Sequence, residues 1–112
     1  MNPTAAPRSR PALAGQRAEE AVLFRRVVLL LRQAQEGADP AAAVAAEEAT
    51  RRLWEGVLRA VERPGTTLPL ALRQGLGTLG GAVLREITQP APDYAFLAAV
   101  NEQVMAGLVT RH

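Results

Sequence analysis

Apolar residues recur along most of the chain at intervals of three or four positions, which is the spacing of one face of an α-helix. In the carboxyl-terminal stretch they form a single stripe, Leu97, Val100, Val104 and Leu108. Alanine, leucine, glutamate and arginine are abundant while isoleucine and aromatic residues are sparse, so residue propensities also favour helix over strand. We therefore expect an all-α fold, a small four-helix bundle with a short disordered N-terminal tail.

Turn and capping residues give the expected boundaries of the helices, which are about 15–36, 40–62, 69–88 and 94 to nearly the carboxyl end. Gly37 suits the left-handed conformation that often follows a helix. Asp39 and Asp93 are placed to cap the second and fourth helices. Pro90 and Pro92 prevent the third helix from continuing.

The length of 112 residues allows one hydrophobic core and one folding unit. We expect a flexible tail rich in arginine and proline over residues 1–13 and a single helical domain over residues 14–112. The tail has no apolar signal-peptide core, and the longest apolar run, 27–31, is far below the roughly 20 residues that a membrane span requires. A cytoplasmic protein without membrane contact is the expectation.

The charged residues do not form a basic face of the kind that binds nucleic acid. All 13 basic residues are arginines, and 11 acidic residues reduce the net charge to +2. Residues 40–62 contain three acid-before-base pairs at four-residue spacing: Glu47 and Arg51, Glu48 and Arg52, Glu55 and Arg59. Such pairs contribute about 0.2–0.5 kcal/mol each and indicate a solvated surface. This interleaving argues against direct binding of nucleic acid.

The chain lacks the side chains that most enzymes use. It has no cysteine and no lysine, its only histidine is the terminal His112, and its only serine is Ser9 in the tail. No standard pair of nucleophile and base can be assembled from this inventory. The carboxylates lack the spacing of a metal site. We expect a protein that is not an enzyme and that binds no cofactor and no metal.

The third helical segment contains the pattern G-x-G-x-x-G at Gly75, Gly77 and Gly80. In dinucleotide-binding proteins this pattern follows a strand, whereas here it follows a helix that opens with Pro69. We interpret the four glycines of this helix, including Gly81, as positions where a neighbouring helix packs closely.

The first helix has more apolar surface than one core-facing stripe requires. Its broad arc comprises Leu23, Phe24, Val27, Val28, Leu30 and Leu31. Val22 and Leu29 form a separate line. A helix that is apolar nearly all round is either central in its own bundle or covered by another molecule. Val22 and Leu29 are therefore candidate partner-binding residues.

Trp54 and Asn101 admit both a structural and a binding interpretation. Trp54 shares one helix face with Thr50, Val57, Leu58 and Val61, which favours a core anchor over a partner contact. Asn101 lies on the apolar stripe of the last helix, so we expect it to be partly buried and to need hydrogen-bond partners.

Several short motifs follow one another in a characteristic order: RLW at 52–54, LPLALR at 68–73, LG at 79–80, VLRE at 83–86 and FLAAVN at 96–101. This pattern, which spans about Arg51 to Leu108, resembles the FlaF family of flagellar biosynthesis regulators. Two positions depart from the family pattern. Thr66 stands where asparagine is common, and Ala82 stands where a large or aromatic residue is frequent.

The resemblance implies a non-enzymatic protein of bacterial flagellar assembly that binds flagellin, as a secretion chaperone or as a regulator of flagellin synthesis. A small helical protein with a spare apolar face would mask the amphipathic terminal segments of flagellin. The candidate partner-binding residues are Val22, Leu29, Trp54, Leu68, Pro69, Leu72, Arg73 and Asn101. For Leu68, Pro69 and Leu72, a helix start and a core contact are the structural alternatives.

Two other functions stay open. The resembled family is tied to regulation alongside a second regulator, FlbT, so the protein would control flagellin mRNA through a partner protein or RNA. The sequence lacks the basic patch with interleaved aromatics that base stacking requires. Alternatively, the chain is a helical oligomerisation module, in which the second stripe of the first helix is buried in a symmetric dimer.

Overall fold

The computed structural model describes residues 9–37 and 39–110, with side chains described over 19–37 and 39–107. It contains four helices, α1 Ser9–Gln35, α2 Pro40–Glu62, α3 Leu70–Glu86 and α4 Tyr94–Thr110. The rest of the described chain forms short turns and loops. The prediction of an all-helical fold with four helices is confirmed.

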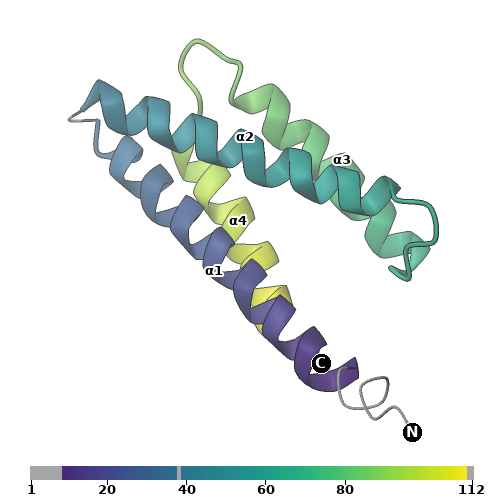
Figure 1. The fold of residues 1–112 in the computed structure, drawn as a ribbon. Helices are drawn as coiled ribbons and strands as arrows, with labels where there is room; N and C mark the ends of the chain where they lie inside the picture. Colours follow the sequence, from purple (N-terminus) through teal and green to yellow (C-terminus); the bar gives the residue numbers. More distant parts are fainter. Residues whose placement is uncertain (1–8, 38, 111–112) are drawn as a thin grey trace, which may run out of the picture.

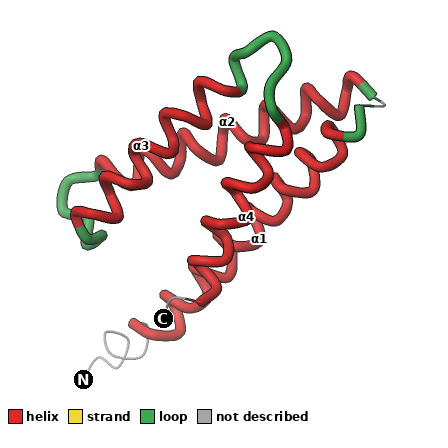
Figure 2. Tube along the Cα trace, turned by 180° about the vertical axis from the view of Figure 1, so that it is seen from behind, coloured by secondary structure: helices red, strands yellow, loops and turns green. Residues whose placement is uncertain are grey.

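The helices form two antiparallel pairs that cross one another (Figure 1). α1 packs along α4 and also against α2, while α3 packs on α2. Seen from behind, the turn between α2 and α3 lies at the end of α2 that is farthest from α1 (Figure 2). The four helices are therefore joined where the pairs cross, and the free ends of the pairs diverge.

The predicted caps position α2 and α4. Oδ1 of Asp39 accepts a hydrogen bond of 2.9 Å from the amide of Ala41, and Pro40 is the first helical residue. Oδ1 of Asp93 accepts one of 3.0 Å from the amide of Phe96. Both bonds satisfy amides that the helix itself leaves without partners. Each Asp therefore determines where the following helix begins.

Two glycines with a positive φ lie in the turns before and after α2. Gly37 has a φ of 75° and Gly65 a φ of 79°, both in the left-handed region that a side chain disfavours. Gly37 lies two residues after Gln35, the last residue of α1, and its left-handed conformation ends the helix near the predicted stop without a steric cost.

Other helix boundaries differ from the predictions. α1 begins at Ser9, six residues before the expected start at residue 15, because Pro11 is tolerated in a first turn, whose amides have no helical partners. The prediction for the tail over residues 1–8 lies outside the described residues. α3 ends at Glu86, before the expected Thr88, because the amide of Thr88 bonds to the carbonyl of Arg85 and tightens the last turn.

The hydrophobic core lies where the two helix pairs cross. Its buried residues are Phe24, Val27, Leu31 and Ala34 of α1, Ala46 and Trp54 of α2, Val83 of α3, Ile87 just after α3, and Leu97, Ala98 and Val100 of α4. Every helix contributes to this core, although α3 contributes mainly near its carboxyl end. No helix in the described part of the chain has the length and apolar character needed to cross a membrane.

Candidate functional site

Trp54 lies at the point where all four helices meet. Its ring contacts Phe24 of α1 edge-to-face, with centroids 6.0 Å apart and an interplanar angle of 89°. Its Nε1 donates a hydrogen bond of 3.0 Å to Oδ1 of Asn101 on α4. Aromatic pairs in this arrangement are favourable, and a buried indole N–H needs an acceptor. Trp54 therefore links α2 to both α1 and α4.

Asn101 satisfies its hydrogen-bonding groups entirely inside the protein. Its Nδ2 donates to the carbonyl of Leu97 at 2.7 Å while its Oδ1 accepts from Trp54. Both Asn101 and Trp54 are 0% exposed. The expectation of a buried, hydrogen-bonded asparagine is confirmed. Neither side chain offers surface to a partner in this conformation, so their contribution to binding would be indirect, through the shape of the core.

Gly80 lies at a close approach of α3 to α2. A Cβ at this position would lie 2.8 Å from Cδ2 of Leu58 and 3.2 Å from Cε3 of Trp54. The interpretation of close packing is thus confirmed for Gly80. It is wrong for Gly75 and Gly77, where an added Cβ would meet no heavy atom of a neighbouring element within 4 Å.

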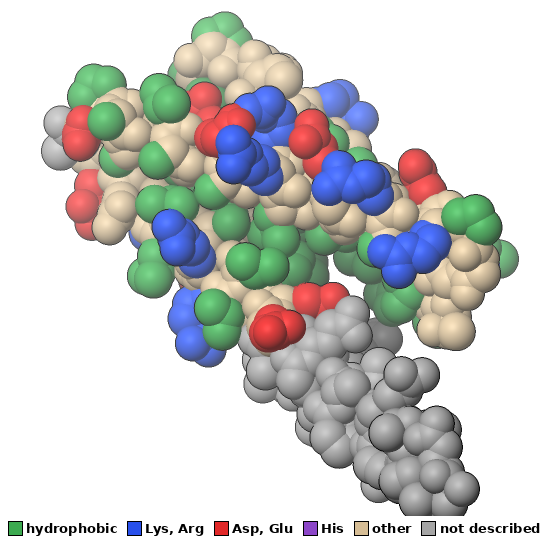
Figure 3. All heavy atoms as spheres, in the orientation of Figure 1, with side chains coloured by type: hydrophobic (Ala, Val, Ile, Leu, Met, Phe, Trp, Pro, Cys, Tyr) green, Lys and Arg blue, Asp and Glu red, His purple; other side chains and the backbone are tan. Residues whose placement is uncertain are grey.

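α1 has apolar side chains on two opposite sides. Phe24, Val27 and Leu31 are buried in the core, whereas Val22 and Leu29 are 55% and 59% exposed. These two residues are seven positions apart and therefore lie above one another, on the side of the helix directed away from the core. Figure 3 shows hydrophobic side chains between arginines and acidic residues along this part of α1. We call Val22 and Leu29 the α1 outer stripe.

Only part of the broad apolar arc of α1 is buried in the core. Leu23 was included in it, but its side chain is 53% exposed. A step of one residue turns a helix by about 100°, which moves Leu23 from the direction of Phe24 to the flank of α1.

The start of α3 is held by a small set of hydrogen bonds. Oγ1 of Thr66 accepts from the amide of Leu68 at 3.3 Å, and Nε of Arg73 donates to the carbonyl of Leu68 at 3.1 Å. Pro69 is the N-cap of α3 rather than its first helical residue. Thr66 thus supplies a hydrogen-bond acceptor in the loop before α3.

We call residues 59–74, the last turn of α2, the loop and the first turn of α3, the α2–α3 end. Within it Leu68, Leu72 and Arg73 are half-buried, while Pro69 and Leu70 are exposed. This end lies at the opposite end of α2 from the turn that joins α1 to α2 (Figures 1 and 2). The exposed or half-buried binding candidates therefore lie in two separate surfaces, the α1 outer stripe and the α2–α3 end, whereas Trp54 and Asn101 lie in the core.

Tyr94 and Glu47 join the start of α4 to α2. The hydroxyl of Tyr94 donates to Oε2 of Glu47 at 2.5 Å. This hydrogen bond, followed by burial, raises the pKa of Tyr94 to about 12. The sequence analysis missed the contact because the two residues are 47 positions apart and Glu47 was assigned to an ion pair with Arg51. Arg51 instead pairs with Glu48.

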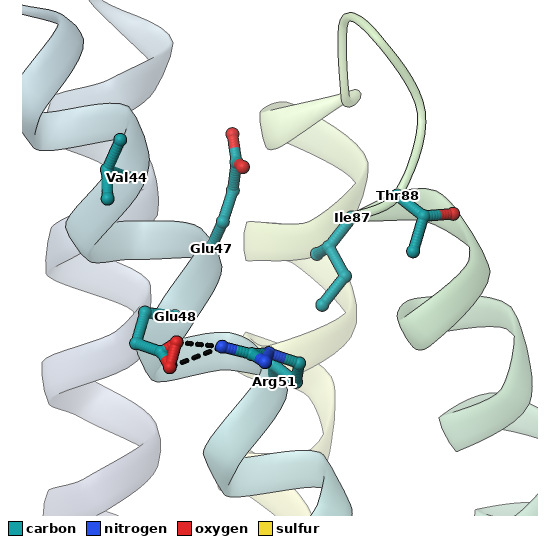
Figure 4. A pocket seen from close by; sticks show the side chains of 6 residues that line it. All are labelled: Val44, Glu47, Glu48, Arg51, Ile87 and Thr88. Carbon is teal, nitrogen blue, oxygen red and sulfur yellow. Dashed lines mark hydrogen bonds and ion pairs between the residues drawn. The ribbon is translucent and has the colours of Figure 1, made fainter.

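An open hollow lies beside this contact (Figure 4). It is lined by Val44, Glu47, Glu48 and Arg51 of α2 and by Ile87 and Thr88 at the end of α3. The ion pair between Glu48 and Arg51 occupies one wall. Over the described residues no group of three or more histidine, cysteine, aspartate or glutamate side chains converges to hold a metal. The hollow has neither a nucleophile nor a paired acid and base that would support catalysis.

The model of the family described as "Flagellar protein FlaF" matches residues 6–108 of the chain. The chain belongs to the FlaF family. Comparisons with curated proteins and with solved structures gave no match. The FlaF match extends beyond the stretch from Arg51 to Leu108 that carried the resemblance and includes α1.

The motifs that carried the resemblance to FlaF occupy identifiable positions in the structure. Trp54 of the RLW motif, Gly80 of the LG motif and Asn101 of the FLAAVN motif meet at the crossing of the helices. The LPLALR motif instead lies in the α2–α3 end. FlaF is a family of flagellar proteins and not a known enzyme family, in agreement with the inventory of side chains.

Proposed function

We propose that this FlaF-family protein binds flagellin in the cytoplasm and acts as a secretion chaperone, a regulator of flagellin synthesis, or both. Family membership supports a role in the flagellum, and the side-chain inventory favours binding over catalysis. The observation that carries the proposal is the two-sided apolar character of α1. Its inner side is buried in the core, whereas Val22 and Leu29 face outward.

An outward apolar stripe on a helix is a suitable surface for an amphipathic helix of a partner. Covering the exposed parts of Val22 and Leu29 would contribute on the order of 1 kcal/mol each, so further contacts are needed for tight binding. The exposed Leu70 of the α2–α3 end is one source of such contacts. Amphipathic partner segments bind in this way through residues spaced three and four apart.

Calorimetric titration of the full chain with flagellin from the same source tests the proposal. We expect binding with a negative heat-capacity change, because apolar surface is removed from water. The double variant Val22→Ser, Leu29→Ser should bind more weakly, whereas Val44→Ser should not, since Val44 is 67% exposed but lies on α2. Absence of binding by the wild-type chain would contradict the proposal and favour FlbT, a self-dimer or RNA as the partner.

A further inference from the structure

The α2–α3 end combines an exposed apolar side chain with unpaired positive charge. Leu70 is 59% exposed although it occupies the first position of α3. Its neighbour Pro69 is also exposed, and the two follow the half-buried Leu68. Leu70 is not part of the hydrophobic core, and most of its apolar side chain faces solvent.

The charges of this end are unbalanced. Residues 59–74 contain Arg59, Arg63 and Arg73 against a single glutamate, Glu62. None of these arginines takes part in the ion pairs that the described residues form. The local excess of two positive charges equals the net charge of the whole chain. An acidic partner is therefore favoured here over a neutral or basic one.

Arg73 is held in a defined orientation. Its Nε donates to the carbonyl of Leu68 at 3.1 Å, and its side chain is half-buried against the loop. Its two Nη groups have no partner among the described residues. A guanidinium that is already oriented loses little freedom on binding a carboxylate, with which it forms two parallel hydrogen bonds.

We propose that the α2–α3 end docks an amphipathic helical segment of flagellin whose apolar stripe is bordered by acidic side chains. An apolar residue of that segment covers Leu70, and its carboxylates pair with Arg73 and Arg63. This inference rests on the proposed function and adds the charge pattern of the bound segment. The complementary charge is what selects the occupant, because an apolar contact alone would accept any exposed hydrophobic surface.

Two matched pairs of variants test the inference in titrations with flagellin. Leu70→Ser is compared with Val44→Ser, since both remove an exposed apolar side chain from a helix surface. Arg63→Glu is compared with Arg85→Glu, since both arginines are exposed and outside the ion pairs. We expect Leu70→Ser to weaken binding about tenfold and Arg63→Glu about fivefold, and the two controls to change it less than about twofold.

Raising the salt concentration should also weaken the binding of the wild-type chain several-fold, and this sensitivity should be reduced in Arg63→Glu. Far-ultraviolet circular dichroism confirms that the variants stay folded, which is expected because the substituted residues are exposed. If the wild-type chain binds flagellin and the test variants bind equally well, the inference is overturned while the proposed function stands. If the wild-type chain does not bind, both are overturned.

Discussion

Nε1 of Trp54 on α2 and Oδ1 of Asn101 on α4 lie 3.0 Å apart inside the core, although the two residues are 47 positions apart in the chain. Both side chains are fully buried, so neither group can replace this hydrogen bond with one to water. A buried donor without a partner costs far more than the net contribution of an ordinary hydrogen bond. The pair therefore fixes how α4 sits against α2.

Replacing Asn101 should destabilise the fold. Asn101→Leu keeps a similar volume but leaves the indole N–H of Trp54 without an acceptor, so we expect the free energy of unfolding to fall by about 1–3 kcal/mol. Urea unfolding followed by far-ultraviolet circular dichroism measures this change. The double variant with Trp54→Phe should lose less than the sum of the two single changes, because the coupled partners are then both absent. Additive losses would contradict the pairing.

Substitutions of glycine in α3 should have opposite effects at two nearby positions. Gly80→Ala should destabilise the protein by about 1–3 kcal/mol, because the added Cβ would meet Leu58 and the ring of Trp54. Gly77→Ala should stabilise it by about 0.5–1 kcal/mol, because its Cβ meets no neighbouring atom and alanine favours the helix. Thermal unfolding of both variants provides the comparison, and a stabilising Gly80→Ala would refute the close approach of α3.

The stability should depend on alkaline pH through Tyr94. Its pKa in the folded protein, about 12, lies above the ordinary value of 10.0, so the phenol of the unfolded chain loses its proton first. The stabilisation is thus fully present below about pH 10 and is lost as the pH rises toward 12. Because the chain has one tyrosine and neither lysine nor cysteine, little else titrates in this range.

Ultraviolet absorbance of the phenolate measures this titration directly. In the folded protein its midpoint should lie well above that of the urea-unfolded chain. The variant Tyr94→Phe should lose the decline in unfolding free energy over this pH range, and Glu47→Gln should lower the midpoint because the carboxylate is the main cause of the shift. An unchanged midpoint in Glu47→Gln would show that another group is responsible.

The ion pair between Arg32 of α1 and Glu102 of α4 should contribute little. Its atoms are 2.8 Å apart, but the two side chains are 42% and 45% exposed. Exposed pairs of this kind contribute about 0.2–1 kcal/mol, and less as salt increases. Arg32→Ala should therefore lower the free energy of unfolding by less than about 1 kcal/mol in a urea titration. A loss above 2 kcal/mol would indicate that the pair organises the packing of α1 on α4.

Local signals in the sequence were sufficient to place both ends of α2 but not the start of α1. Asp39 and Pro40 mark the beginning of α2, and the break at Pro64 and Gly65 marks its end, so both boundaries of α2 were predicted correctly. The start of α1 was missed because the prolines among the first dozen residues, including Pro11 inside the helix, suggested an irregular tail. A proline in a first helical turn has no steric conflict, so its presence cannot by itself exclude a helix.

The contacts between helices could not be predicted in the same way. Helical periodicity indicated that Trp54 and Asn101 face the interior, but it does not specify which buried groups will meet. The pairing of Tyr94 with Glu47 depends on how α4 returns across α2. For the same reason the sequence could not distinguish Gly80 from Gly75, because only the crossing point of α3 and α2 decides which glycine must lack a side chain.

Trp54 is the single tryptophan of the chain, and it lies where α1, α2, α3 and α4 meet. The protein therefore carries an intrinsic optical reporter of its tertiary structure. Its fluorescence should be blue-shifted in the folded state and should move to longer wavelength when the helix pairs separate. The α1 outer stripe and the α2–α3 end both lie away from this ring, so a partner that binds without moving the crossing will leave the emission unchanged. A spectral shift on binding would instead report that the partner opens the core.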